Sequence, residues 1–218
     1  MDSRDAIFDR VRTALGRKLG QKPLPPPEPL LRVGHQSLAA RIGSFKSALE
    51  ALNGTVTVVP DSAAVGAAVE KLLDGQPGVA SNHPFLAACG IPGLNGVTSG
   101  ITATEELRNA CAAAGIGITS AYCLLAETGT IVLRARPDEP RLLSLLPPVH
   151  IAVVHQDRLL TNLDEMLSMI PRPVDDSSAM IFITGPSRTG DIEQFLVRGV
   201  HGPGAVHVII VQGKNPSP

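Results

Sequence analysis

Continuous apolar runs alternate with amphipathic segments along most of the chain. The runs that read as β-strands are residues 55–59, 78–81, 116–119, 130–135, 150–154, 179–184 and 206–211. Several of them lack the alternation of a half-exposed strand, so we expect both faces of their sheet to be covered. The segments between them, such as 161–170 and 190–198, are long enough for crossover helices. This order predicts an α/β fold with a mostly parallel, doubly wound sheet.

Two amphipathic helices are expected before the first strand. Residues 3–19 carry an apolar side chain at every fourth position: Ile7, Val11, Leu15 and Leu19. Five prolines between residues 23 and 29 cannot continue this helix and predict an extended spacer. The second helix has its apolar positions between Leu38 and Leu52. The sequence thus predicts an N-terminal helical arm with its spacer, residues 1–29, and a main domain, residues 30–218.

Composition narrows the classes of partner. Apolar residues make up 44% of the chain, while aromatic residues reach 3% and Trp is absent, so Val, Ile, Leu and Ala must build the core. A formal net charge of −1 gives no electrostatic footprint for nucleic acid or an anionic membrane. No apolar run approaches the roughly 20 residues that span a bilayer, and the first residues are charged, unlike a signal peptide. We therefore expect a cytoplasmic protein.

The three cysteines do not form a metal-binding pattern. The spacing of Cys89, Cys111 and Cys123 matches neither a zinc motif nor an iron–sulfur motif. We expect these residues to be structural thiols, with no metal site and no cofactor in this chain.

A loop rich in glycine and hydroxyl groups follows the strand 179–184. Its candidate ligands for an anion are Thr184, Gly185, Ser187, Arg188 and Thr189. A helix expected to begin near Asp191 would add free backbone amides, which favour a carboxylate or phosphate. In the alternative interpretation, Asp191 only caps the helix and Gly185–Pro186 is only a turn. Asp191 stands where a nucleotide-binding loop has lysine, so the sequence does not indicate ATP hydrolysis.

Two further side chains are candidates for proton transfer. His201 lies in a glycine-rich turn, where its ring either enters a cleft or fixes the turn through a carbonyl. Glu127 precedes Thr128 and Gly129 among apolar neighbours, so we expect a partly buried carboxylate that acts as acid, base or acyl nucleophile. Alternatively, Glu127 accepts backbone hydrogen bonds or pairs with Arg188. The residues identify no partner for His83 or His155, which we leave out of the predicted site.

Four ordered motifs resemble the LUD domain, the lactate-utilization domain of lactate-utilization protein C and its relatives. The motifs are AETGTIVL at 126–133, SLLPPVHIAVV at 144–154, ITGPSRTGDIE at 183–193 and GVHGPGAVHVII at 199–210. The resemblance covers residues 121–212 and implies a fold similar to the NagB/RpiA/CoA-transferase superfamily. It also implies a role in oxidising L-lactate to pyruvate with two sister subunits, at least one of which carries iron–sulfur clusters.

Three hypotheses follow from these patterns. In the first, the chain is a non-redox subunit that binds a small carboxylate near Arg188, with Glu127 and His201 placed for proton movement. In the second, it is a stand-alone acyl-transfer or isomerase-type enzyme, since Glu127-Thr128-Gly129 is similar to the Glu-Asn-Gly turn of CoA transferases. In the third, it is a scaffold or regulatory module whose N-terminal arm reaches a partner. The first requires that Glu127, Arg188, Asp191 and His201 surround one pocket.

Overall fold

The structure, a computed structural model, describes residues 3–18, 20–21, 36–170, 177–190, 196–198 and 202–216. The chain divides into two compact units, Met1–Arg32 and Val33–Pro218. The predicted boundary after residue 29 falls outside the described residues and stays a prediction.

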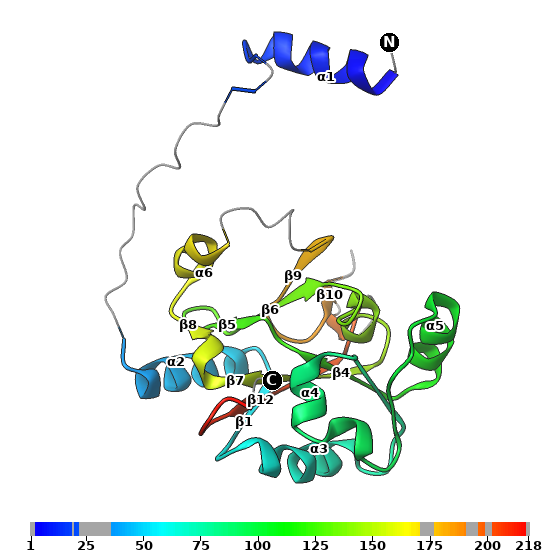
Figure 1. The fold of residues 1–218 in the computed structure, drawn as a ribbon. Helices are drawn as coiled ribbons and strands as arrows, with labels where there is room; N and C mark the ends of the chain where they lie inside the picture. The colour runs from blue at the N-terminus through cyan, green and yellow to red at the C-terminus, as the bar shows by residue number, and fades with distance from the viewer. Residues whose placement is uncertain are drawn as a thin grey trace. The chain divides into compact units, whose positions relative to one another are not determined.

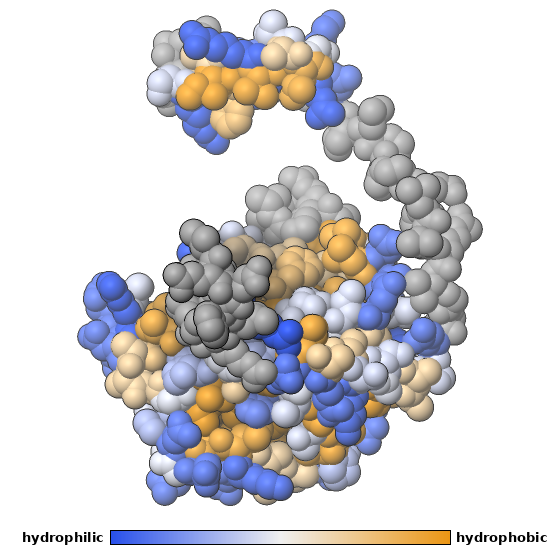
Figure 2. All heavy atoms as spheres, turned by 180° about the vertical axis from the view of Figure 1, so that it is seen from behind, coloured by the Kyte–Doolittle hydropathy of each residue, from blue (hydrophilic) through white to orange (hydrophobic). Residues whose placement is uncertain are grey.

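The first unit contains one helix, α1 (Ser3–Ala14), among its described residues. No side chain of α1 is buried, and its apolar residues Ile7, Phe8 and Val11 are exposed. They form an apolar stripe along one side of the helix, which Figure 2 shows in orange. The helix is shorter than the predicted 3–19, and Leu19 lies outside the described residues.

The second unit is built on a six-stranded parallel sheet (Figure 1). Its strands, in spatial order, are β1 (Thr55–Val59), β12 (Ala205–Val211), β7 (Val149–His155), β4 (Ile116–Ser120), β2 (Gly78–Ala80) and β3 (Val97–Thr98). Every neighbouring pair is parallel. The predicted α/β class with a mostly parallel sheet is therefore confirmed.

Both faces of this sheet are buried, as the continuous apolar runs predict. On β7, Ile151 and Val153 face a cluster that includes α3 (Val65–Leu73) and α4 (Pro84–Ala88), while Ala152 and Val154 face the opposite cluster with α2 (Leu38–Ala51). Side chains alternate between the two faces of a strand, so a strand with helices on both sides must be apolar throughout. Short 3-10 turns and a further helix complete the periphery: η1 (Ser62–Ala64), η2 (Ile91–Gly93), α5 (Thr104–Ala113), η3 (Arg141–Ser144) and η4 (Gln156–Arg158).

A second, four-stranded sheet covers part of one face of the first. Its strands, in spatial order, are β8 (Leu159–Leu160), β5 (Cys123–Leu125), β6 (Thr130–Ala135) and β9 (Ala179–Ile183). Leu124 and Ile131 pack toward the parallel sheet, whereas Val132 packs on the other side with α6 (Leu163–Met169). Two of the predicted strands, β6 and β9, are thus antiparallel neighbours in this smaller sheet.

The helix predicted from Asp191 to residue 198 is wrong. Residues 188–190 form β10 (Arg188–Gly190) and pair in antiparallel register with β11 (Leu196–Arg198). Asp191 itself lies outside the described residues. The glycines that suggested a helix start also permit the strand that the backbone forms at 188–190.

Candidate functional site

The predicted acidic turn is the loop between β5 and β6, at residues 126–129. The backbone N–H of Glu127 donates to the carbonyl of Thr161 across 3.0 Å. The side chains of Glu127 and Thr128 are both exposed. The expected partial burial of the Glu127 carboxylate is therefore wrong, because the turn directs the side chain to solvent while its backbone is held by Thr161.

Two glycines let the predicted loops approach the end of α2. Gly129 has a φ of 66°, and an added Cβ would lie 2.6 Å from the backbone nitrogen of Leu49. Gly185 has a φ of 97°, and its added Cβ would lie 3.0 Å from the Cβ of Leu52. Arg188 donates from Nη2 to the carbonyl oxygen of Leu52 across 2.6 Å. Both loops therefore border the same end of one helix.

A chain of threonine hydroxyls also joins the two loops. The Oγ1 atoms of Thr128 and Thr130 are 2.6 Å apart, and those of Thr130 and Thr184 are 2.8 Å apart. The N–H of Ser187 donates to the carbonyl of Pro203 across 2.9 Å. The side chain of Thr189, and the whole of Asp191 and His201, lie outside the described residues. The roles predicted for these residues stay predictions.

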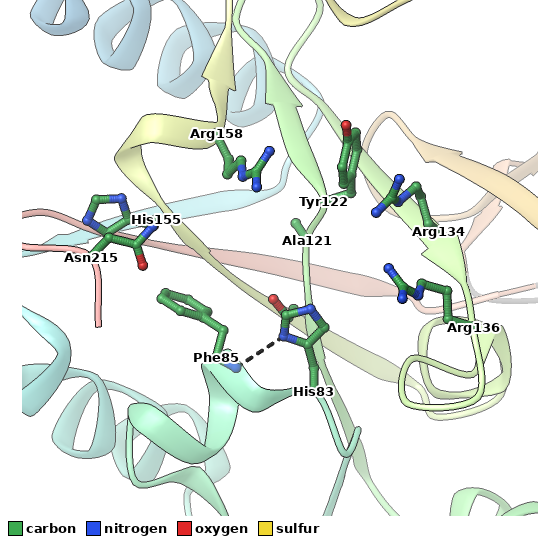
Figure 3. Close-up of a pocket in the computed structure, with 10 residues that line it drawn as sticks. His83, Phe85, Ala121, Tyr122, Arg134, Arg136, His155, Arg158 and Asn215 are labelled. Atoms are coloured by element: carbon green, nitrogen blue, oxygen red, sulfur yellow. Dashed lines mark hydrogen bonds between the residues drawn. The ribbon is translucent and has the colours of Figure 1, made fainter. Parts of the chain in front are cut away.

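A polar pocket lies elsewhere, at the carboxyl ends of four parallel strands (Figure 3). Its cavity of about 240 Å³ is lined by His83, Phe85, Ser120, Ala121, Tyr122, Arg134, Arg136, His155, Arg158 and Asn215. Ser120 ends β4 and His155 ends β7, while His83 and Asn215 follow β2 and β12. Open α/β sheets bind ligands at this edge, where loops leave the strands. A smaller cavity of about 30 Å³ adjoins it and is lined in part by Glu139.

Three arginines give this pocket its positive charge. Arg134 and Arg136 are two positions apart along β6 and its extension, so they share a side of the strand, and Arg158 comes from η4. The Cζ atoms of Arg134 and Arg158 lie 3.9 Å and 5.6 Å from the ring centroid of Tyr122. Arg136 Nε is 3.7 Å from Asp138 Oδ1. Stacking on the aromatic ring holds guanidinium groups in a fixed orientation, which suits recognition of a planar anion.

His83 contributes a neutral ring to the pocket. Its Nδ1 accepts the backbone N–H of Phe85 across 3.2 Å and so caps α4. Burial lowers the pKa of His83 below its usual value, and the nearby Arg136 acts in the same direction, although Asp138 opposes it. Because Nδ1 accepts a hydrogen bond, the proton of the neutral ring is on Nε2, which is then a hydrogen-bond donor.

His155 fixes the opposite wall of the pocket. Its Nε2 lies 3.2 Å from the carbonyl oxygen of Gly213, and its Nδ1 lies 3.3 Å from the backbone nitrogen of Asp157. The ring also meets Phe85 edge to face, with centroids 6.5 Å apart. These contacts hold the segment after β12 beside the end of β7, which places Asn215 at the pocket.

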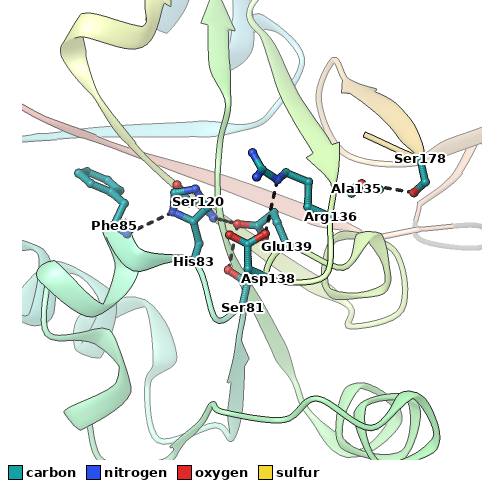
Figure 4. A network of polar contacts seen from close by, with 9 residues as sticks. All are labelled: Ser81, His83, Phe85, Ser120, Ala135, Arg136, Asp138, Glu139 and Ser178. Atoms are coloured by element: carbon teal, nitrogen blue, oxygen red, sulfur yellow. Dashed lines mark hydrogen bonds and ion pairs between the residues drawn. The ribbon is translucent and has the colours of Figure 1, made fainter. Parts of the chain in front are cut away.

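Glu139 is a buried acid close to Arg136 (Figure 4). Only 4% of the residue is exposed, and its Oε2 accepts both the hydroxyl of Ser81 and the backbone N–H of Ser120, each across 2.9 Å. Burial raises the pKa of Glu139 to about 8, against the effect of these two hydrogen bonds. The carboxyl group is therefore mostly protonated at neutral pH, so it does not cancel the charge of the arginines.

The comparison with protein families covers most of the chain. A model described as the LUD domain matches residues 42–211. The chain belongs to the LUD domain family. This confirms the resemblance carried by the four sequence motifs, while the broader superfamily resemblance stays a prediction.

Several curated relatives of this LUD domain share its central region. Lactate utilization protein C of Bacillus licheniformis is 37% identical over 105 residues, which cover 46% of this chain and 44% of the relative. The protein of the same name from Deinococcus radiodurans is 38% identical over 43% of this chain and 45% of the relative. That from Bacillus subtilis is 36% identical over 50% and 48%. The chain thus spans about half the length of the curated relatives it matches.

A solved structure shares the fold. The crystal structure of a DUF162 family protein from Deinococcus radiodurans superposes with a TM-score of 0.62 at 23% identity, covering 82% of this chain and 100% of that one. The likeness supports the architecture of the LUD domain. Among the residues that the structure describes, no helix is long and apolar enough to cross a membrane.

The residues around the arginine pocket of this LUD domain were not predicted from the sequence. His83 and His155 were left out of the predicted site, and Arg134, Arg136, Arg158 and Glu139 were not considered. A signal was present for some of them, because Ser120 and His155 directly follow predicted strands and therefore lie at the edge where ligands bind. No local pattern marks Glu139, whose burial depends on contacts with Ser81 and Ser120.

Proposed function

We propose that this LUD-domain protein acts in lactate utilisation by binding a small carboxylate in the pocket between β2, β4, β6 and β7. The observation that carries the proposal is the convergence of Arg134, Arg136 and Arg158 around one cavity at the carboxyl ends of the parallel strands. The name that the curated relatives share, lactate utilization protein C, supports the process.

The chemistry of the lining favours a carboxylate. A guanidinium group donates two parallel hydrogen bonds that match the two oxygens of a carboxylate. The nearby acid, Glu139, is mostly neutral at pH 7, so the arginines face little competing negative charge. A cavity of about 240 Å³ is smaller than the roughly 300–1,000 Å³ of pockets that take drug-sized ligands. These properties suit a short acid such as lactate or pyruvate.

The proposal moves the anion from the predicted loop to the arginine pocket. In the loop, Arg188 donates to the carbonyl of Leu52, which occupies part of its hydrogen-bonding capacity within the fold. We further propose that the protein is a non-redox subunit, and that electrons from lactate pass through partner subunits carrying iron–sulfur clusters. The letter C in the relatives' name, lactate utilization protein C, supports the idea that such a protein is one member of a set that works together.

Calorimetric titration tests this function. The protein is titrated with L-lactate, pyruvate and propanoate at pH 7, alone and with candidate partner subunits. We expect binding of at least one acid, and we expect Arg158→Gln to weaken it about tenfold, because a hydrogen bond to a charged group is worth about 1.5–3 kcal/mol. Arg108→Gln is the matched control, since Arg108 is exposed on α5 and does not line the cavity.

Two outcomes would contradict the proposal. One is the absence of binding of all three acids in every setting. The other is equal binding by the protein, Arg158→Gln and Arg108→Gln, which would place any bound acid away from the arginines.

A further inference from the structure

One oxygen of the buried Glu139 carboxyl group has no hydrogen-bond partner within the described part of the chain. Oε2 accepts from Ser81 and Ser120, but Oε1 is equally buried and has no hydrogen-bond partner among the residues that the structure describes. The residue lines the small cavity that adjoins the arginine pocket, together with His83, Arg134 and Arg136. A buried polar atom without a partner costs about 1–3 kcal/mol, which points to a ligand that completes it.

The loop that carries Glu139 is held rigidly. The backbones of Arg136 and Glu139 exchange hydrogen bonds of 3.2 Å and 3.1 Å, and the N–H of Asn82 donates to the carbonyl of Asp138 across 3.0 Å. The loop after β6 is thereby fixed to the end of β2. Figure 4 shows the carboxyl group between the serines and the side of the loop that carries Arg136. A ligand-binding group fixed in advance loses little entropy on binding.

Burial, more than the surrounding charges, sets the protonation state of Glu139. Asp138 comes from its own loop and raises the pKa, while Arg136 and Arg134 come from the loop and from β6, and His83 follows β2. Burial dominates and brings the pKa to about 8. Because Oε2 already accepts two hydrogen bonds, the proton of the neutral acid belongs on Oε1. That atom is then a hydrogen-bond donor without an acceptor.

We propose that Glu139 selects the ligand by donating a hydrogen bond from Oε1 to an oxygen on the carbon next to the carboxylate, so that the pocket prefers a short 2-oxo acid or 2-hydroxy acid. This inference rests on the proposed function, in which the arginines hold the carboxylate itself. The arginines alone accept any short carboxylate. A simple acid such as propanoate leaves the Glu139 donor unpaired, and a site built around such a donor discriminates against ligands that lack the matching acceptor.

The first experiment compares pyruvate with propanoate, which lacks the oxo oxygen. Affinities are measured by calorimetry at pH 7 and pH 9 for the protein, for Glu139→Gln and for Glu106→Gln, a control on the exposed side of α5. For a pKa of about 8, the protonated share of Glu139 falls from about nine-tenths to about one-tenth between these pH values. We expect pyruvate affinity to fall about tenfold over this range in the protein and in the control.

Glu139→Gln keeps the shape of the side chain but removes its titratable proton. Its amide oxygen still accepts from Ser81 and Ser120, and its amide nitrogen donates at every pH. We expect this variant to keep the preference for pyruvate over propanoate while its affinity changes less than twofold between pH 7 and pH 9.

A second measurement needs no variant. Titration of the unaltered protein with pyruvate at pH 8, in two buffers of different ionisation enthalpy, gives the number of protons taken up on binding. We expect uptake of roughly half a proton, because a bound acceptor favours the protonated acid. Binding without uptake overturns the inference, as does equal affinity for pyruvate and propanoate at pH 7 or a tenfold pH effect that persists in Glu139→Gln. Each of these results leaves carboxylate binding intact, whereas no binding of either acid overturns the proposed function as well.

Discussion

The Nε2 atom of His150 lies 2.8 Å from the hydroxyl of Thr119, between two adjacent strands of the parallel sheet. The histidine is fully buried, and burial lowers its pKa to about 3, with the nearby His207 acting in the same direction. His150 is therefore neutral in the folded protein at any physiological pH. Its enclosure within the sheet indicates a structural role.

His150 should contribute a loss of stability as the pH falls from about 6.5 toward 3. In this window His150 takes up a proton only when the chain unfolds, because its folded pKa is below its unfolded value. The free energy of unfolding falls by at most about 1.4 kcal/mol per pH unit from this residue. Glu139 has the opposite slope from about pH 4.5 to 8, because its folded pKa is raised. Between pH 7 and pH 5 the two contributions oppose each other, so urea denaturation should show His150→Gln gaining more stability on going to pH 5 than the unaltered protein does. An equal change in both proteins would count against the buried neutral histidine.

Gly129→Ala should destabilise the main unit by about 2 kcal/mol or more. The residue is in the left-handed region, which costs a side chain about 1–2 kcal/mol, and the new Cβ meets the backbone of α2. Gly43→Ala is the matched control, because Gly43 lies within α2 with no atom near its added Cβ, and alanine there should stabilise by about 0.5–1 kcal/mol. Chemical denaturation of both variants checks the pair, and a neutral Gly129→Ala would contradict the close approach.

The three cysteines should react slowly in the folded protein. Cys89, Cys111 and Cys123 are free and buried, and burial raises the pKa of Cys89 to about 11 and that of Cys123 to about 12. The thiolate is the reactive form, so the burial of the thiols and their raised pKa both slow labelling. A thiol-reactive dye should label all three in denaturant and label the native protein far more slowly. Rapid labelling under native conditions would show that these thiols are not structural.

Glu127→Gln should leave both stability and pyruvate affinity nearly unchanged, within about 0.5 kcal/mol and twofold, because the side chain is exposed and lies outside the arginine pocket. The alternative of acyl transfer through Glu127 makes a different prediction. Incubation with acyl-CoA thioesters would then give a mass adduct that is absent in Glu127→Gln. We expect no adduct, and its appearance would restore that alternative.

Much of the fold could be predicted because its strands carry their own signal. β7 and β12 are uninterrupted apolar runs, which only a sheet covered on both faces accommodates. The partners of β6 and β9 could not be predicted, since pairing between them depends on contacts about 50 residues apart in the chain. The segment around Arg188 was read as the start of a helix for a different reason. Its glycines and hydroxyls are typical of a turn before a helix, and they do not mark the short antiparallel pairing with Leu196–Arg198.

The pocket was harder to predict than the fold. Arg134 lies inside a strand that was predicted correctly, but whether it faces a cavity depends on where the end of β4 lies. Glu139 was the hardest residue to predict. Its protonation depends on burial against Ser81 and Ser120, which lie far from it in the sequence. Hydroxyl contacts between Thr130 and Thr184 join the loops at Gly129 and Gly185, whereas a pocket shared by Glu127, Arg188, Asp191 and His201 stays a prediction.

The position of Asn215 in the pocket wall decides how the protein should be handled. Since Nε2 of His155 lies beside the carbonyl of Gly213 and Asn215 lines the cavity, a label attached at Asn215 itself would occupy the wall of the pocket. Labels for immobilisation or fluorescence therefore belong away from this segment.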